Sequence, residues 1–306
     1  MDKVYNIMSA MRGNMNRVML KAKAKVNLSL DVTGIREDGY HEMKMINHSI
    51  ELDDVLTFEA CDEGIILTSN ENTIPLDERN LVIKAACKLQ SQFDVKQGVK
   101  IHLEKRIPAQ AGLAGGSSDA AATLRGLNTL WQLGLSQSEL LAIGVAIGAD
   151  VPYCLVGGTA LVEGIGEKIT PLKNLRKMAV LVVKPDIDIA TPWAFKKLDG
   201  STIAKHPDIA AIITLLEDDD YDGLKANLGN VFEAIAFADY PEIEAIKKEM
   251  LEQGALAAIM TGSGSTVIGY YRDQQLAEKS WQQFKEKYPM CFLSKIAESE
   301  GENDVG

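Results

Sequence analysis

A glycine-rich segment carries residue types that are suited to holding a phosphate group. Glycines let the backbone approach a ligand closely, and a helix start supplies free N–H groups and a positive dipole end. The segment lies between a predicted strand and a predicted helix, and no lysine follows its last glycine, so it is not a P-loop. A phosphate cradle and ligand-free packing of small residues explain the pattern equally well. Its residues are Pro108, Ala109, Gln110, Ala111, Gly112, Leu113, Ala114, Gly115, Gly116, Ser117 and Ser118.

Two charged residues stand in surroundings that call for an explanation. Asp150 lies inside the apolar stretch 140–162, so its carboxylate must be solvated, paired or functional. Taken alone, it is equally suited to cap a turn between a buried helix and a buried strand. Lys25 ends the segment Lys21-Ala22-Lys23-Ala24-Lys25, whose lysines alternate onto one face of a strand. Such a face is ordinarily solvated.

Aromatic residues near predicted loops could hold a planar group. Tyr40 and His41 follow a glycine turn, where a ring can stack on a nucleobase and an imidazole can bond its polar edge. Phe195 falls in a short predicted helix over 191–198, with Pro192 at its first position. By pattern alone Phe195 is a core residue and Tyr40 covers a loop.

The elements that must position these residues are strands and helices mixed without a regular βαβ alternation. This mixture predicts an α+β fold rather than a doubly wound sheet. We expect one domain over 1–170 and a second over 171–306, and residues 1–14 fit a ragged extension before a downstream start. Strands are predicted over 26–32 (half-buried), 50–59, 64–68, 99–103, 178–183, 256–260, 266–271 and 291–296. Helices are predicted over 81–92, 117–131, 136–148, 191–198 and 274–287, with others within 207–254.

Composition narrows the class of protein. The chain has 306 residues, of which 46% are hydrophobic and 25% charged, as in an ordinary globular protein. The formal charge of −11 argues against a nucleic-acid or membrane partner, and no obligate protein partner is evident. The four cysteines lie far apart, which predicts reduced thiols in the cytoplasm and no metal cage of His and Cys.

Three motifs together carry a resemblance to a known family. The segment Pro-x-x-x-Gly-Leu-x-Gly-Gly-Ser-Ser-Asp-Ala-Ala from Pro108 resembles the ATP loop of the galactokinase, homoserine kinase, mevalonate kinase and phosphomevalonate kinase (GHMP) superfamily. The segment 24–28 with Asp38-Gly39-Tyr40-His41, and the segment 148–152, resemble motifs of the GHMP kinases that act on a cytidine-diphosphate-linked methylerythritol. The resemblance implies an N-terminal ATP-loop domain, a C-terminal ferredoxin-like domain, and an active site in the cleft between them.

The resemblance also implies roles for individual residues. Asp150 would accept or orient the proton of the substrate hydroxyl, and Lys25 would pair with Asp150 and steady charge on the transferring phosphoryl group. Residues 108–118 would bind ATP, with Asn80 and Lys105 nearby. Mg²⁺ would accompany the nucleotide, with Ser117 or Ser118 as its protein contact. The substrate would be held by Asn27, Tyr40, His41, Thr191 and Phe195.

A third glycine segment, 261–266, resembles the superfamily's C-terminal glycine motif, with Ser265 where many members have Pro or Ala. Lys23 likewise stands where Pro is frequent before Ala24-Lys25.

The implied reaction is transfer of the ATP γ-phosphate to the 2-hydroxyl of the cytidyl substrate in the non-mevalonate isoprenoid pathway. The alternatives are a GHMP kinase for homoserine, mevalonate or a sugar, which Tyr40, His41 and Phe195 disfavour, and a non-catalytic nucleotide-binding module, which an intact Lys25 and Asp150 disfavour.

Overall fold

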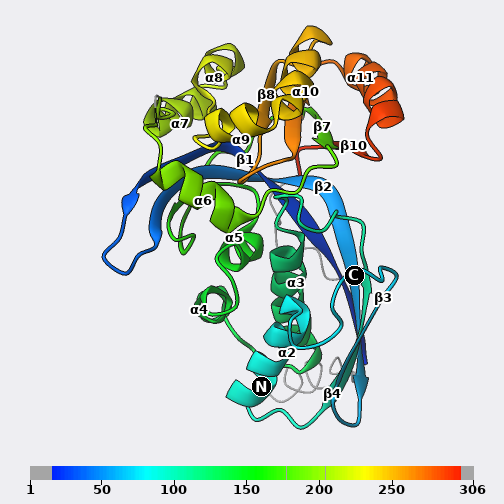
Figure 1. The fold of residues 1–306 in the computed structure, drawn as a ribbon. Helices are drawn as coiled ribbons and strands as arrows, with labels where there is room; N and C mark the ends of the chain where they lie inside the picture. Colours follow the sequence, from blue (N-terminus) through cyan, green and yellow to red (C-terminus); the bar gives the residue numbers. More distant parts are fainter. Residues whose placement is uncertain (1–15, 177, 204, 298–306) are drawn as a thin grey trace, which may run out of the picture.

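The computed structural model describes residues 16–297 except 177 and 204, so the expected extension over 1–14 lies outside the described residues. Strands and helices are mixed, which confirms the α+β prediction, and the described strands form two separate sheets (Figure 1). The chain passes from the first sheet to the second between its sixth and seventh strands. None of the described helices is long and apolar enough to cross a membrane.

A long hairpin organises the first sheet. The strand β2 pairs with β1 along almost its whole length, from Arg17 opposite Glu59 to Ile35 opposite His41. On its other edge, β2 pairs with β5 near its start and with β4 near its end, so one strand ties the sheet together. The strands of this sheet are β1 (Arg17–Ile35), β2 (His41–Cys61), β3 (Ile65–Ser69), β4 (Gly98–Glu104), β5 (Thr159–Gly164) and β6 (Lys168–Pro171).

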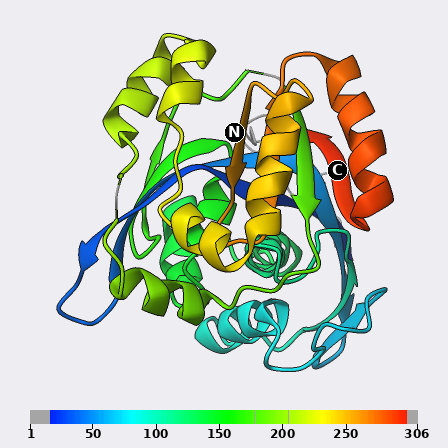
Figure 2. The same cartoon turned by 45° about the horizontal axis from the view of Figure 1, so that its top comes forward.

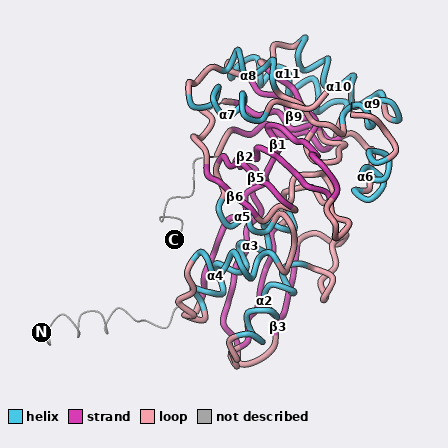
Figure 3. Tube along the Cα trace, turned by 90° about the vertical axis from the view of Figure 1, so that its left-hand side faces the viewer, coloured by secondary structure: helices cyan, strands magenta, loops and turns pink. Residues whose placement is uncertain are grey.

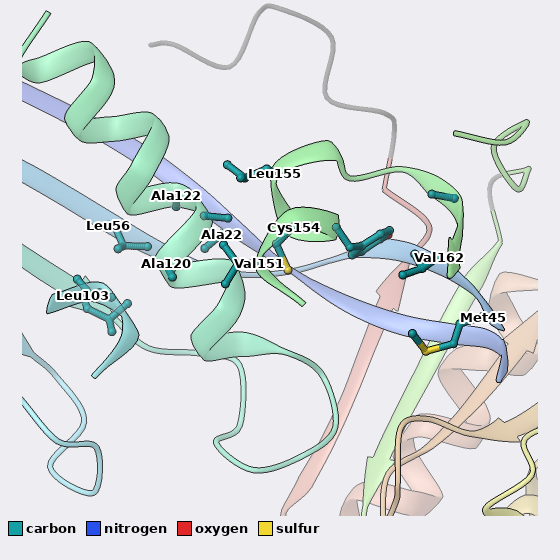
Figure 4. Packing of buried hydrophobic residues seen from close by; sticks show 14 of the residues in the cluster. Ala22, Met45, Leu56, Leu103, Ala120, Ala122, Val151, Cys154, Leu155 and Val162 are labelled. Atoms are coloured by element: carbon teal, nitrogen blue, oxygen red, sulfur yellow. The ribbon is translucent and has the colours of Figure 1, made fainter. Parts of the chain in front are cut away.

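Four helices lie together beside the long strands of this sheet (Figure 1). Small side chains let α3 approach the sheet closely: Ala120 and Ala122 are fully buried near Ala22 of β1, with Val151 of α5 beside them (Figure 4). The helices are α2 (Leu81–Gln92), α3 (Gly115–Leu130), α4 (Gln137–Val145) and α5 (Val151–Val156).

Two helix starts follow directly from local sequence. The Asn80 side chain accepts a hydrogen bond from the Val82 N–H, and α2 has the predicted bounds. At α4, Ser136 and Glu139 form the predicted capping box.

The second sheet has the strand order β10-β7-β9-β8 and is antiparallel throughout. Helices α10 and α11 pack on it (Figure 2), and Figure 3 shows the C-terminal helices at one end of the molecule and α2, α3 and α4 at the other. The strands are β7 (Ala179–Lys184), β8 (Ala257–Met260), β9 (Val267–Tyr271) and β10 (Met290–Lys295). The helices are α6 (Thr191–Asp199), α7 (Ile209–Glu217), α8 (Tyr221–Asn227), α9 (Glu233–Asp239), α10 (Pro241–Glu252) and α11 (Gln274–Lys287).

The strand predicted over 26–32 is present as part of β1, but the expectation that it is half-buried was wrong. All residues from Val26 to Val32 are buried, including the polar Asn27, Ser29 and Asp31. Val26 and Leu28 share one apolar cluster with Val180 and Val182 of β7, and the polar Asn27 accepts hydrogen bonds from Thr261 and Gly262, so both kinds of side chain are covered by the second half of the chain. The two sheets therefore share a core, and β1 is a strand of the first sheet that contributes to it.

Two smaller expectations also differ from the structure. The stretch 140–162 contains an additional short helix, α5, so Asp150 is the residue that precedes a helix rather than part of a turn into a strand. Pro152 near the start of α5 suits this position, because a proline there loses no helical hydrogen bond. In α6, Thr191 is the first helical residue and Pro192 the second, after Ala190 as N-cap.

Candidate active site

A pocket of about 640 Å³ opens where the two sheets meet, and it gathers most of the residues singled out from the sequence. Its walls come from β1, the loop before α3, the start of α5, the turn before β2, and α6. The expected site residues among its lining are Lys25, Tyr40, His41, the loop from Pro108 to Ser117, Asp150, Thr191 and Phe195. Phe232, Gly262 and Ser263 also line it.

The glycine loop leaves the start of α3 without a side-chain cap. Ala114 is the N-cap residue and has a left-handed backbone, with φ of 53°, and no side chain bonds the first N–H groups of the helix. Gln110 and Gly112 also have positive φ, 55° and 72°. The first N–H groups of α3 are donors without intrahelical partners, and Gly115, Gly116 and Ser117 line the pocket. This geometry suits an anion.

Lys25 and Asp150 meet in the pocket although they lie on different elements. Lys25 Nζ is 3.5 Å from Asp150 Oδ1, and the two side chains are 6% and 38% exposed. Lys25 Nζ also donates to Asn27 Oδ1 at 3.4 Å, and the Lys25 N–H donates to the Leu113 carbonyl. The Asp150 side chain does not cap α5, so its carboxylate faces Lys25. The ordinary interpretation of the lysine row as a solvated face therefore fails at Lys25, which is buried.

The third glycine segment closes against the glycine loop from the other domain. Asn27 Oδ1 accepts hydrogen bonds from the Gly262 N–H at 2.8 Å and from Thr261 Oγ1 at 3.1 Å. Thr266 Oγ1 donates to the Ala111 carbonyl at 2.6 Å. A Cβ on Gly112 would lie 3.1 Å from the Thr261 carbonyl oxygen, so a glycine allows the two loops to approach.

Rings from separate elements form a stack in the wall of the pocket. His41 stacks on Phe195 with ring centroids 4.3 Å apart, and Phe195 meets Phe232 edge-on at 5.1 Å. His41 Nε2 lies 2.7 Å from Asp199 Oδ1, which fixes the imidazole orientation. Tyr40 is 61% exposed at the rim. Thr191 Oγ1 lies 3.3 Å from Ser263 Oγ and joins α6 to the third glycine segment.

Four of the expected ligands do not line this pocket. Asn80 caps α2 and also donates to the Pro75 carbonyl. Ser118 Oγ donates to the Lys23 carbonyl, and Asn27 is fully buried between the two domains. Lys105 lies behind the loop, where its ammonium contacts Asp54 and Asp119. These four side chains serve packing or positioning contacts in this structure.

Sequence reasoning missed Asp199 and Phe232. No local signal marks them, because Asp199 ends an amphipathic helix and Phe232 precedes another. Asp199 meets His41, and Phe232 meets Phe195, only in the folded structure, because the two members of each pair lie on different elements.

The donor set of the pocket suits Mg²⁺ that arrives with a nucleotide. Within the described residues, no group of three or more His, Cys, Asp and Glu could hold a metal ion by itself. Magnesium usually binds through few protein oxygens together with substrate phosphates. The hydroxyl of Ser117, which lines the pocket at the start of α3, matches this mode.

Comparison with known proteins agrees with this arrangement. Residues 80–158 match the family described as "GHMP kinases N terminal domain", and residues 201–289 match "GHMP kinases C terminal". The fold and site thus define a small-molecule kinase of the GHMP class.

Similar proteins narrow this class. The chain is 46% identical over 276 residues to 4-diphosphocytidyl-2-C-methyl-D-erythritol kinase of Clostridium tetani, covering 90% of this chain and 99% of that protein. It is 45% identical over 283 residues to the kinase of the same name from Caldicellulosiruptor bescii, covering 92% and 99%. The chain belongs to the 4-diphosphocytidyl-2-C-methyl-D-erythritol kinase family.

Solved structures resemble the chain over nearly its whole length. A crystal structure of 4-(cytidine 5'-diphospho)-2C-methyl-D-erythritol kinase aligns with a TM-score of 0.80 and 30% identity, covering 92% of this chain and all of the other. Homoserine kinase from Cytophaga hutchinsonii aligns with a TM-score of 0.75 at 19% identity, covering 94% and 97%, and shares the fold.

Proposed function

We propose that this protein transfers the γ-phosphate of ATP to the 2-hydroxyl of 4-diphosphocytidyl-2-C-methyl-D-erythritol, a step of the non-mevalonate isoprenoid pathway. One observation carries the proposal. A single pocket combines an uncapped glycine loop, a lysine–aspartate pair and an aromatic stack with an oriented histidine. Phosphate, reacting hydroxyl and nucleobase would each find a matching surface there.

The nucleotide end of the pocket is the loop from Pro108 to Ser117. The uncapped N–H groups of α3 would donate to the ATP phosphates, and the helix dipole favours their negative charge. GHMP kinases use ATP as co-substrate. Mg²⁺ bound to the nucleotide would be held by Ser117 together with the phosphates, and it would neutralise charge on the transferring group.

The reacting hydroxyl would lie between Asp150 and the loop. Asp150 would accept or orient its proton, because the carboxylate is free of helix capping and reaches the pocket. Lys25 would keep the carboxylate in place and place a positive charge beside the transferring phosphoryl group. Thr191, which lines the pocket, would reach the substrate phosphates.

The base end of the pocket would hold cytosine. Phe195 offers a face for stacking, and Tyr40 at the rim could cover the opposite side. Because Asp199 engages His41 Nε2, the other ring nitrogen of His41 would be left for the polar edge of the base.

The four cysteines are free thiols, which suits a reducing compartment such as the cytoplasm, where we place the reaction. The sequence's net charge of −11 supports a small-molecule substrate rather than a nucleic-acid or anionic-membrane partner.

The test is ADP release from the purified protein with Mg-ATP. The cytidyl substrate, homoserine, mevalonate and galactose are offered in parallel. Turnover with the cytidyl substrate alone is expected. Turnover with another alcohol would contradict the base-stacking pocket, and no turnover with any of them, despite ATP binding, would contradict the proposed reaction.

Asp150→Asn tests the proposed proton acceptor. Turnover should fall by about 10²- to 10⁴-fold, the usual contribution of a general base. The variant should fold and bind ATP, because Lys25 keeps its contact with Asn27. Glu163→Gln, at a partly exposed carboxylate paired with Lys44, is the control and should turn over normally. Normal turnover in Asp150→Asn would remove that residue from the mechanism.

A further inference from the structure

Three charged side chains lie buried behind the glycine loop and outside the pocket lining. Asp54 on β2, Lys105 just after β4 and Asp119 on α3 have side chains that are 0%, 8% and 3% exposed. Burying charges costs free energy unless they are paired and hydrogen-bonded, and removing one partner of such a set is strongly destabilising. The position of this cluster, directly against both ends of one loop, therefore needs an explanation.

The cluster fixes the chain that leads into the loop. Lys105 Nζ contacts Asp54 Oδ2, while Asp54 Oδ1 accepts from the backbone N–H groups of Arg106 at 2.5 Å and Ile107 at 2.8 Å. The Asn70 side chain bonds both backbone groups of Lys105. Its Oδ1 accepts from the Lys105 N–H at 2.7 Å, and its Nδ2 donates to the Lys105 carbonyl at 3.2 Å. The two residues before Pro108 therefore have almost no freedom.

The same ammonium holds the chain that leaves the loop. Lys105 Nζ lies 3.0 Å from Asp119 Oδ2, and Asp119 is the fifth residue of α3. Its neighbour Ser118 is tied to the Lys23 carbonyl at 2.7 Å. One side chain thus joins both flanks of the segment between Ile107 and Gly115.

The ammonium also lies close behind the phosphate cradle. A Cβ placed on Gly115 would lie 2.9 Å from Lys105 Nζ, although Gly115 lines the pocket and Lys105 does not. The loop itself holds Gln110 and Ala114 at positive φ. Such conformations cost free energy in residues other than glycine, and they persist only where the surroundings impose them.

We propose that Asp54, Lys105 and Asp119 are positioning residues that set the shape of the nucleotide loop, with Lys105 acting through the backbone at Gly115 rather than by contact with the nucleotide. This proposal rests on the proposed function only in that a nucleotide phosphate occupies the loop. Burial raises the pKa of Asp119 well above its ordinary value, and the nearby charge of Asp54 raises it further, against the opposing effect of Lys105. Asp119→Asn is therefore the conservative variant, because it keeps an oxygen towards Lys105 without the charge.

The test measures binding of a fluorescent ATP analogue to the full-length protein without any alcohol substrate. Asp119→Ala removes the oxygen that accepts from Lys105 and should weaken binding about tenfold. Asp119→Asn keeps an oxygen that accepts from the charged Lys105, so it should weaken binding less than about threefold. Asp54→Asn gives a second, independent break, because its amide N–H would face the ammonium while its oxygen still accepts from Arg106 and Ile107. Glu104→Gln, at the exposed ion pair with Arg106, is the matched control and should bind normally.

Steady-state kinetics then separate positioning from a general loss of stability. Asp119→Ala and Asp54→Asn should raise the KM for ATP while the KM for the alcohol stays near the wild-type value, with melting temperatures recorded for each protein. If Asp119→Ala or Asp54→Asn folds and binds the nucleotide as tightly as Glu104→Gln does, the proposal is overturned. Because binding is measured without the alcohol, absence of turnover with the cytidyl substrate would refute the proposed reaction and leave this result standing.

Discussion

The buried imidazole of His48 makes the stability of the two-domain structure depend on pH. His48 lies on β2 and is fully buried, and its Nε2 is 2.6 Å from the Tyr270 hydroxyl on β9 of the other sheet. Its Nδ1 lies 3.3 Å from the Ser49 carbonyl, which requires a proton on Nδ1 and leaves Nε2 to accept from Tyr270. Burial lowers the pKa of His48 from 6.5 to about 4.

The sign and size of the effect follow from these values. In the unfolded chain His48 takes up a proton near pH 6.5, whereas in the folded protein it stays neutral down to about pH 4. Between these values the unfolded state binds more protons, so the free energy of unfolding falls as the pH falls. Integrated from pH 7 to pH 5, the loss that His48 contributes is about 2 kcal/mol.

The assay is the free energy of unfolding of wild type and His48→Gln between pH 7 and pH 5. Glutamine can accept from Tyr270 and donate to Ser49, so the contact between the sheets is kept while the titration is removed. Between pH 7 and pH 5, the free energy of unfolding of the variant should fall by about 2 kcal/mol less than that of wild type. This difference does not depend on how stable the variant is at pH 7. Parallel pH profiles for the two proteins would refute the assignment of His48 as a buried neutral residue.

Three further substitutions test the loops and helix ends. Gly112→Ala places a side chain at φ of 72° and 3.1 Å from the Thr261 carbonyl oxygen, so it should lower stability by about 1–2 kcal/mol and raise the KM for ATP. Phe195→Ala should raise the KM for the cytidyl substrate by about 5- to 150-fold, since base stacking contributes about 1–3 kcal/mol, with the KM for ATP nearly unchanged. Ser136→Ala removes the capping box of α4 and should lower the free energy of unfolding by about 1 kcal/mol without changing kcat, as checked by denaturation and steady-state kinetics.

Local features of the sequence predict much of the secondary structure. Helix α11 has the predicted bounds, Gln274–Lys287, and α2 begins after the predicted cap Asn80. Both rest on short-range signals, namely a capping side chain and apolar residues at helical spacing. The helix α5 was missed because six residues with a proline and flanking glycines carry no such periodicity.

Residue types and their order in the chain determined the class of protein and the chemistry available to it: a glycine loop before a helix, one lysine, one aspartate and a histidine beside an aromatic ring. Tertiary structure decided which of these side chains face the pocket. Lys25 is buried, with Asp150 and the Leu113 carbonyl as its partners, and Asn27 bonds the third glycine segment from the other half of the chain. Asn27 and Thr261 are 234 residues apart, and a strand's own alternation cannot report a surface that arrives from so far along the chain. Burial and partner choice at the site are therefore properties of the packed molecule, whereas caps and helix periods are properties of short segments.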